Sequence, residues 1–282
     1  MKSTLLHCML LSLATGLVRA ETAAVPAPAD PAPSPARVTV AALGTMPKSV
    51  VKWGTDGQIS YEMSEAQTLP PTGLHVKVVK NGKKEYVPFA LTLNIPSVPA
   101  PFGAEGLVLY GPDAAKAEDQ KKQPEAVMTI PTVKTADYQM IMMWRKEPKD
   151  DWKHPEYLPV DLAESVFPPG SVYFINFTQR SVRLVMPQTN QARPMAFKSG
   201  FVITPGKSAP TFNYKIDCLG KNNEILPICF TGIKVDAAAR SVVTVYEGAD
   251  GRPVAASFAV PAKPAPEKNS GSPATSMAVS TN

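Results

Sequence analysis

The sequence predicts an all-β protein of antiparallel β-sandwich architecture, arranged as two small sandwich-like domains with disordered Pro/Ala-rich ends. Many short segments alternate apolar and polar side chains with a period of two, as half-buried strands do. Turn signals separate them about every 8 to 12 residues, a spacing typical of sandwiches and barrels. The chain also contains 30 Pro against 17 Gly, and so much Pro interrupts helices. These observations exclude a long helical bundle.

The first predicted hairpin surrounds Asn81-Gly82, a pair typical of a type I′ turn between strands His75–Lys80 and Lys84–Val87. Residues Tyr138–Trp144 place large apolar side chains on both faces in alternation, so we expect this strand to be covered on both sides. The other strands expected in this part of the chain are 58–62, 87–93, 107–110 and 126–130.

The later part of the chain repeats the strand pattern. Ser171–Thr178 leads directly into Ser181–Met186, and Ser241–Tyr246 is followed by the turn Asp250-Gly251 and the returning strand Val254–Val260. The other strands expected here are 201–204, 211–218 and 228–235. Helix-compatible segments are scarce, and no internal repeat of fixed period is visible.

Two β domains account for the central region. We place β domain 1 at 38–148, a polar Pro-containing connection at 149–159 and β domain 2 at 160–262. The linker 21–37 and the tail 263–282 have too few large apolar side chains to offset the entropy of ordering, so we expect both to be disordered. One large β domain over the same central residues is the alternative.

Residues 1–20 have the three-part pattern of a secretory signal. Lys2 precedes an apolar run, and Val18-Arg19-Ala20 ends it with a small residue at the expected cleavage site. We therefore predict export to the periplasm or the extracellular space. No other stretch approaches the roughly 18 apolar residues of a membrane span, so no transmembrane segment is expected in the mature chain.

Basic residues only slightly outnumber acidic ones. The chain has 29 Lys and Arg against 24 Asp and Glu, and removal of Lys2 and Arg19 with the signal leaves 27 against 24, a net charge of about +3. The basic residues are scattered, whereas a nucleic-acid binder usually shows a dense basic face. We do not expect nucleic acid as a partner.

Cys218 and Cys229 would be the two cysteines of the exported chain, which favours a disulfide between them. A two-Cys, two-His metal site with His75 and His154 is the alternative, but the spacings do not fit one. A tight hairpin turn next to Cys218 would separate the thiols beyond the reach of a disulfide. We therefore expect Leu219–Ile228 to form a ten-residue loop closed at its base by this bond.

The densest polar and aromatic segment is Lys149–Tyr157, in the predicted connection. Its carboxylates, imidazole and rings could bind a cation or stack on a sugar ring. In the alternative interpretation the segment is a solvated connection in which Trp152 is buried as an anchor. The candidate ligand-binding residues are Asp150, Asp151, Trp152, His154, Glu156 and Tyr157.

Other chemistries find little support in the sequence. It contains no G-x-S-x-G nucleophile elbow and no phosphate-binding loop that leads into a helix. The methionines around Tyr138–Trp144 suit a copper(I) site less well than an apolar strand interior. We assign no catalytic residue, no metal and no cofactor.

The phrase Phe167-Pro-Pro-Gly-Ser-Val-Tyr-Phe-Ile-Asn-Phe-Thr178, followed later by Phe201-Val-Ile-Thr-Pro-Gly206, resembles exported bacterial β-rich proteins of unknown function. The resemblance covers the C-terminal half only. It implies a β-sandwich unit in an envelope or secreted protein, and it brings no catalytic residues with it.

Together these observations predict an exported, non-catalytic β-sandwich protein that acts as a binding, adaptor or structural module of the cell envelope. Its partner would be another envelope protein or a polysaccharide. The alternative is a secreted hydrolase, carbohydrate-active or metal-assisted, that uses the acids and the histidine of the connection. Acids that converge in one pocket would favour the hydrolase, and acids that point apart on a solvated loop would favour the module.

Overall fold

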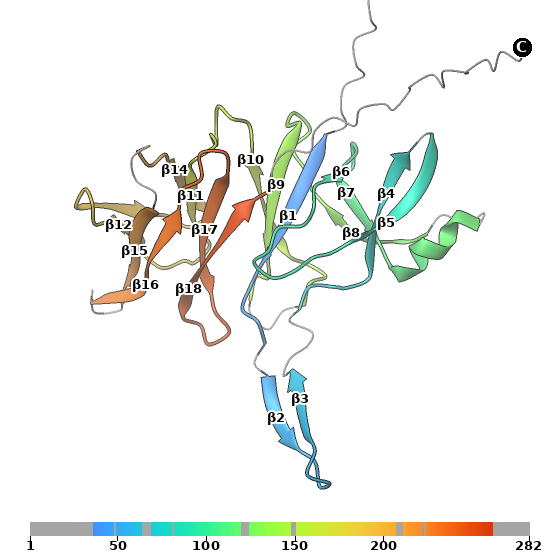
Figure 1. Ribbon diagram of the computed structural model, residues 1–282, viewed down its shortest axis with the longest axis horizontal. Helices are drawn as coiled ribbons and strands as arrows, with labels where there is room; N and C mark the ends of the chain where they lie inside the picture. Colours follow the sequence, from blue (N-terminus) through green and yellow to red (C-terminus); the bar gives the residue numbers. More distant parts are fainter. Residues whose placement is uncertain are drawn as a thin grey trace, which may run out of the picture. The chain divides into compact units, whose positions relative to one another are not determined.

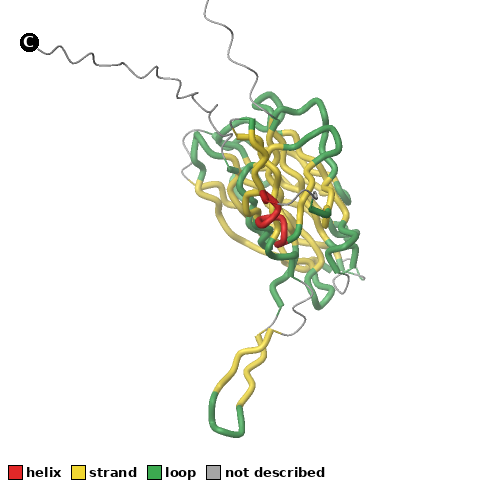
Figure 2. Tube along the Cα trace, turned by 90° about the vertical axis from the view of Figure 1, so that its right-hand side faces the viewer, coloured by secondary structure: helices red, strands yellow, loops and turns green. Residues whose placement is uncertain are grey.

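The computed structural model describes residues 36–47, 49–63, 69–80, 82–119, 124–147, 151–206, 211–220, 222 and 224–261. Strands make up nearly all of its regular structure (Figure 1), together with the short 3-10 helix η2 (Pro112–Asp119), drawn in red in Figure 2. The predicted all-β class is confirmed. The predicted signal peptide, the tail 263–282 and nearly all of the linker lie outside the described residues.

The first half of the chain forms two four-stranded sheets. Sheet I has the strand order β10-β9-β1-β6, and sheet II has the order β5-β4-β7-β8. The strands of sheet I are β1 (Arg37–Leu43), β6 (Ala100–Pro101), β9 (Tyr138–Trp144) and β10 (Glu156–Asp161). The strands of sheet II are β4 (Leu74–Lys80), β5 (Lys83–Phe89), β7 (Leu107–Tyr110) and β8 (Ala126–Ile130). Strands β2 (Ser49–Trp53) and β3 (Ile59–Met63) form a separate two-stranded hairpin.

The second half also forms two four-stranded sheets. Sheet III has the order β14-β11-β17-β18, and sheet IV has the order β13-β12-β15-β16. The strands of sheet III are β11 (Val172–Asn176), β14 (Ser199–Ile203), β17 (Arg240–Glu247) and β18 (Pro253–Val260). The strands of sheet IV are β12 (Val182–Met186), β13 (Gln191–Met195), β15 (Thr211–Leu219) and β16 (Ile225–Lys234).

The two halves share one topology, once the β2–β3 hairpin is set aside. In chain order, the eight strands β1, β4, β5, β6, β7, β8, β9 and β10 correspond to β11, β12, β13, β14, β15, β16, β17 and β18, and every pairing within the sheets is reproduced. The first strand of each half runs parallel to the seventh, β1 to β9 and β11 to β17, while the other pairs are antiparallel. The chain is therefore a tandem repeat of one eight-stranded sandwich.

The repeat extends to backbone detail. Asn94 follows β5 with φ 57°, and Lys198 follows β13 with φ 54°. The N–H of Asn94 donates to the carbonyl of Ala42 in β1, and the N–H of Lys198 donates to the carbonyl of Asn176 in β11, both at 2.7 Å. Each sandwich therefore uses a left-handed residue at the same place to bring the chain back to its first strand.

Three apolar cores lie between the four sheets, which Figure 1 shows side by side in the order IV, III, I, II. The first and third cores fill the two sandwiches, and the second lies between sheets I and III, where it joins the sandwiches to each other. Every side chain of β9 is buried, which confirms the predicted covering on both faces. The described residues all belong to one compact unit.

The predicted disulfide between Cys218 and Cys229 is wrong: both cysteines are free. Strand β16 begins at Ile225 instead of Ile228, so β15 and β16 form a continuous hairpin with a short turn in place of the expected ten-residue loop. Cys218 opposes Leu226, and Cys229 opposes Ile216. The two cysteines are thus diagonal neighbours, whose Cα atoms typically lie about 7–8 Å apart, beyond the reach of most disulfides.

We expect Cys218 and Cys229 to be free thiols with different reactivities. Cys218 is 1% exposed and Cys229 is half-buried, and burial raises the pKa of both thiols, so little thiolate forms at neutral pH. A thiol reagent should label Cys229 slowly and Cys218 more slowly in the native protein, and both rapidly in urea. Absence of label on either Cys218 or Cys229 in urea without reductant would contradict the hairpin geometry.

Candidate functional site

The described charged side chains of the predicted ligand-binding segment do not lie together in one place. Asp151 is exposed and turns back on its own loop, where Oδ1 accepts from the N–H of Lys153 at 2.9 Å and Oδ2 lies 3.6 Å from that residue's Nζ. His154 is exposed as well. Asp150 lies outside the described residues. Asp151 is therefore satisfied locally instead of pointing into a pocket.

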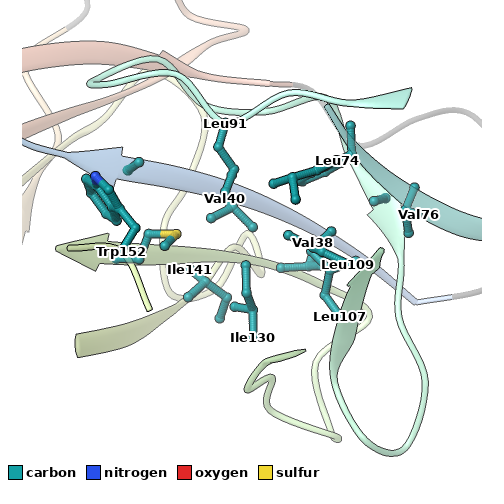
Figure 3. Packing of buried hydrophobic residues seen from close by; sticks show 14 of the residues in the cluster. Val38, Val40, Leu74, Val76, Leu91, Leu107, Leu109, Ile130, Ile141 and Trp152 are labelled. Atoms are coloured by element: carbon teal, nitrogen blue, oxygen red, sulfur yellow. The ribbon is translucent and has the colours of Figure 1, made fainter. Parts of the chain in front are cut away.

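The two aromatic residues of the segment face the interior. Trp152 is 4% exposed and packs into the core of the first sandwich with Val40, Leu91 and Ile141 (Figure 3). The Arg145 guanidinium lies 5.7 Å from the centre of its ring. Trp152 is thus buried, as the anchor interpretation expects, but its contacts are with the first sandwich's own core.

Tyr157 is half-buried against the same core, and burial raises the pKa of its phenol. Trp152 is therefore too deeply buried to stack on a ligand, whereas Tyr157 leaves part of its ring exposed. Strand β10 begins at Glu156, so the end of the predicted connection forms an edge of sheet I.

Glu156, of the predicted set, lines a hollow at the contact between the two sandwiches. This hollow, which we call the inter-sandwich groove, has a volume of about 400 Å³ and lies where sheets I and III meet. It is bordered by the C-terminal ends of β1, β9 and β17 and by the segments that follow β11 and β13. Its lining residues are Leu43, Gly44, Trp144, Arg145, Lys146, Glu156, Phe177, Gln179, Phe197, Lys198, Tyr246 and Glu247.

Aromatic rings from both sandwiches form the floor of the groove. The rings of Trp144 and Phe177 lie 4.4 Å apart between centres and are tilted by 49°. Trp144, Phe177 and Tyr246 are each at most 7% exposed, whereas Phe197 at the rim is 43% exposed. The floor is therefore a packed apolar surface, and Phe197 is the ring that an incoming molecule would meet first.

Hydrogen bonds fix the two sandwiches to each other beneath the groove. The hydroxyl of Tyr246 donates to the carbonyl of Gly44 at 3.0 Å, and Nδ2 of Asn94 lies 3.0 Å from the same hydroxyl oxygen. Burial raises the pKa of Tyr246, so its phenol stays protonated and can donate. These hydrogen bonds hold in place the contact over which the groove lies.

An ammonium group crosses the groove. Lys198 Nζ lies 2.6 Å from Glu156 Oε2, 5.2 Å from the centre of the Trp144 ring and 5.1 Å from that of Phe197. Both distances are within the range of cation–π attraction. Lys198 belongs to the second sandwich, and Glu156 and Trp144 to the first, so this cluster joins the two.

The rim carries more cations than anions. Arg145, Lys146 and Lys198 face two carboxylates, of which Glu156 pairs with Lys198. The other, Glu247, lies 3.3 Å from Nε of Arg180 outside the lining. The groove therefore favours a molecule that brings a negative charge.

A second hollow of about 290 Å³ lies between β10 and β14, which are edge strands of sheets I and III. Residues Pro159–Asp161 of β10 and Gly200–Val202 of β14 line it, with Phe167 and Tyr173. Gly200 is required here, because an added Cβ would lie 2.8 Å from the Tyr173 ring and 2.4 Å from the Phe174 carbonyl oxygen. Strand β10 thus contributes to both hollows, and β14 contributes to the second.

Within the part of the chain that the structure describes, no three His, Cys, Asp or Glu side chains are placed to share a metal ion. No helix of this part is long and apolar enough to cross a membrane. No protein-family model and no curated protein sequence matches the chain.

The sequence interpretation missed most of the groove. The groove residues lie in strands and loops up to 204 positions apart in the chain, Leu43 to Glu247, and the packing of one sandwich on the other brings them together. One signal was present: Trp144 ends a strand that is apolar on both faces and is followed by Arg145 and Lys146. An aromatic residue followed by charges at the end of a buried strand indicates a place where a core opens to the surface.

Proposed function

We propose that the protein is an exported, non-catalytic binding or adaptor module of the cell envelope, and that it holds an extended segment of another envelope protein in the inter-sandwich groove. The observation that carries this proposal is the groove itself, because both sandwiches contribute to it and their contact is fixed by buried side chains. The signal-like residues 1–20 support export.

The neighbouring edge strands favour a polypeptide over a polysaccharide. Strands β10 and β14 are edges of their sheets, so each presents backbone groups that have no partner within its own sheet. An extended peptide satisfies such groups by adding as a further strand. Pro159 interrupts the β10 edge, since it has no N–H, so β14, which begins directly after Lys198 of the groove and lines the second hollow, is the better receiving strand.

The side chains specify what the peptide should contain. The apolar floor and the exposed Phe197 suit an aliphatic or aromatic side chain, and the rim cations suit an acidic one. We therefore propose a segment that combines large apolar residues with Asp or Glu.

The hydrolase alternative needs paired acids in one site. Asp151 and Glu156 instead pair with different lysines, Lys153 and Lys198, and only Glu156 lines the groove. This separation favours the binding module.

Binding of synthetic ten-residue peptides tests the proposal. Peptides that combine apolar and acidic residues should bind, and replacement of their acids with lysine should abolish binding. Phe197→Ala should weaken binding about tenfold, the usual cost of truncating an interface aromatic residue. Lys146→Glu should weaken binding further, because it reverses the charge of a rim cation. Phe197 and Lys146 are both exposed, so both variants should fold.

Val127→Ala, an exposed residue of β8 outside the groove, is the matched control and should bind as the wild type does. Equal binding by wild type and Phe197→Ala would overturn the groove as the site. Binding of envelope polysaccharides in place of peptides would overturn the polypeptide partner.

A further inference from the structure

Lys198 takes a backbone conformation that suits other residues better than lysine. Its φ of 54° lies in the left-handed region, which Gly and Asn adopt with less strain than residues with long side chains. Its equivalent in the first sandwich is Asn94, because the N–H of each residue donates to the first strand of its own sandwich. The lysine at this position therefore needs a reason other than the backbone conformation.

These two equivalent residues reach equivalent rings of the opposite sandwich. The register of the parallel strand pairs, β1 with β9 and β11 with β17, makes Trp144 and Tyr246 equivalent as well. Asn94 Nδ2 lies 3.0 Å from the hydroxyl oxygen of Tyr246. Lys198 Nζ lies 5.2 Å from the centre of the Trp144 ring. The contact between the sandwiches thus contains one arrangement twice, with an amide in one copy and an ammonium group in the other.

The amide and the ammonium group have different roles. The side chain of Asn94 is held by the backbone of Gly44, since its Nδ2 donates to the Gly44 carbonyl at 2.7 Å and its Oδ1 accepts from the Gly44 N–H at 3.3 Å. The side chain of Lys198 is instead 39% exposed at the groove, with Nζ 2.6 Å from Glu156 Oε2. Asn94 therefore closes the contact, whereas Lys198 presents a positive charge to the hollow.

We propose that Lys198 receives an acidic side chain of the bound segment, and that Glu156 competes with that side chain for the ammonium group. This inference rests on the proposed function, because it assigns a partner to the anion within the same groove. In the empty groove, Glu156 holds the ammonium group above the Trp144 ring. In the complex, a carboxylate of the segment takes the place of the Glu156 carboxylate.

The exposure of the ion pair makes this exchange feasible. The side chains of Lys198 and Glu156 are 39% and 32% exposed, so water reaches and screens the pair, and breaking such a pair costs little. The displaced Glu156 can turn to water. Arg145 and Lys146 add positive charge to the same rim, which favours the incoming carboxylate. The affinity for acidic segments therefore depends on the difference between the two carboxylates.

Calorimetric titration with ten-residue peptides amidated at the C-terminus tests the role of Lys198. The acidic peptide then has carboxylates only on its Asp or Glu side chains, and a neutral twin has Asn or Gln in their place. Lys198→Asn introduces the residue that the first sandwich has at this position, so the fold should be kept. It should weaken binding of the acidic peptide about tenfold and leave the neutral twin unchanged, because only the acidic peptide loses a charged partner. Lys198→Arg keeps the charge and should retain most of the affinity.

Glu156→Gln tests the competition. Removal of the competing carboxylate should strengthen binding of the acidic peptide about threefold to fivefold, the contribution of a partly exposed ion pair. In the double variant Glu156→Gln/Lys198→Asn this gain should vanish, because Glu156 acts through Lys198. Glu105→Gln, which removes the same charge at an exposed position outside the groove, is the control and should bind as the wild type does.

The outcomes separate this inference from the proposed function. If the wild type binds the peptides, an equal effect of Lys198→Asn on both peptides, or no gain from Glu156→Gln, would overturn the role of the ion pair and leave the groove as the peptide site. If the wild type binds neither peptide, the proposed function fails, and N-acetylphenylalanine, one carboxylate beside one ring, is the probe. Its binding to Glu156→Gln but not to Lys198→Asn would support the carboxylate site, and its binding to neither would overturn that site as well.

Discussion

Replacement of Trp152 with alanine is expected to lower the free energy of unfolding by about 3–5 kcal/mol. The side chain is 4% exposed within the first core, and its loop offers few other apolar groups to hold it against the sheets (Figure 3). Removal of the indole leaves a cavity and also takes away the ring under the Arg145 guanidinium. Urea unfolding followed by circular dichroism measures the change.

Two controls accompany this variant. Trp53→Ala makes the same substitution at a site that is 73% exposed, and His154→Ala changes an exposed neighbour in the same loop. Both should stay within about 0.5 kcal/mol of the wild type. An unchanged midpoint for Trp152→Ala would refute the anchor and make the segment a candidate binding loop again.

The sequence was sufficient for the class of fold because strand periodicity is a local property. Tyr138–Trp144 is apolar on both faces, and this alone predicts a strand between two layers. The identity of its partners is not local. Strand β9 lies parallel to β1, about one hundred residues earlier, and no pattern within either strand specifies that pairing.

The tandem repeat is not visible in the sequence, and the reason is physical. Equivalent positions must satisfy the same geometry, but different residues can do so. Asn94 and Lys198 both take the left-handed conformation, and the backbone N–H of each donates at 2.7 Å to the first strand of its own sandwich. The first sandwich also contains the β2–β3 hairpin and η2, which break any constant spacing between equivalent strands. Topology is therefore repeated where sequence is not.

The candidate site illustrates the same limit. The polar segment around Trp152 attracted attention because its charges are adjacent in sequence, yet Asp151 is satisfied within its own turn. The groove is instead lined by Trp144, Phe177 and Tyr246. In the sequence, each of these looks like an ordinary core residue in or next to a strand. Only the packing of one sandwich on the other reveals that these rings share a surface.

The apolar core between sheets I and III should make the two sandwiches unfold cooperatively. Trp144 is 7% exposed in that core, contacts Phe177 and lies beneath the Lys198 ammonium. Trp144→Ala should therefore cost about 3–5 kcal/mol. Because sheets I and III are each buried on the face that the other covers, neither sandwich can unfold without exposing the shared core.

We accordingly expect a single unfolding transition in the wild type, and a single transition at a lower midpoint in Trp144→Ala. Differential scanning calorimetry distinguishes this from independent sandwiches, since coupled unfolding requires the calorimetric enthalpy to equal the van't Hoff enthalpy. Trp53→Ala again serves as the control, with an unchanged midpoint. Two resolved transitions, of which Trp144→Ala shifts only one, would show that the sandwiches unfold separately and that the shared core contributes little to their stability.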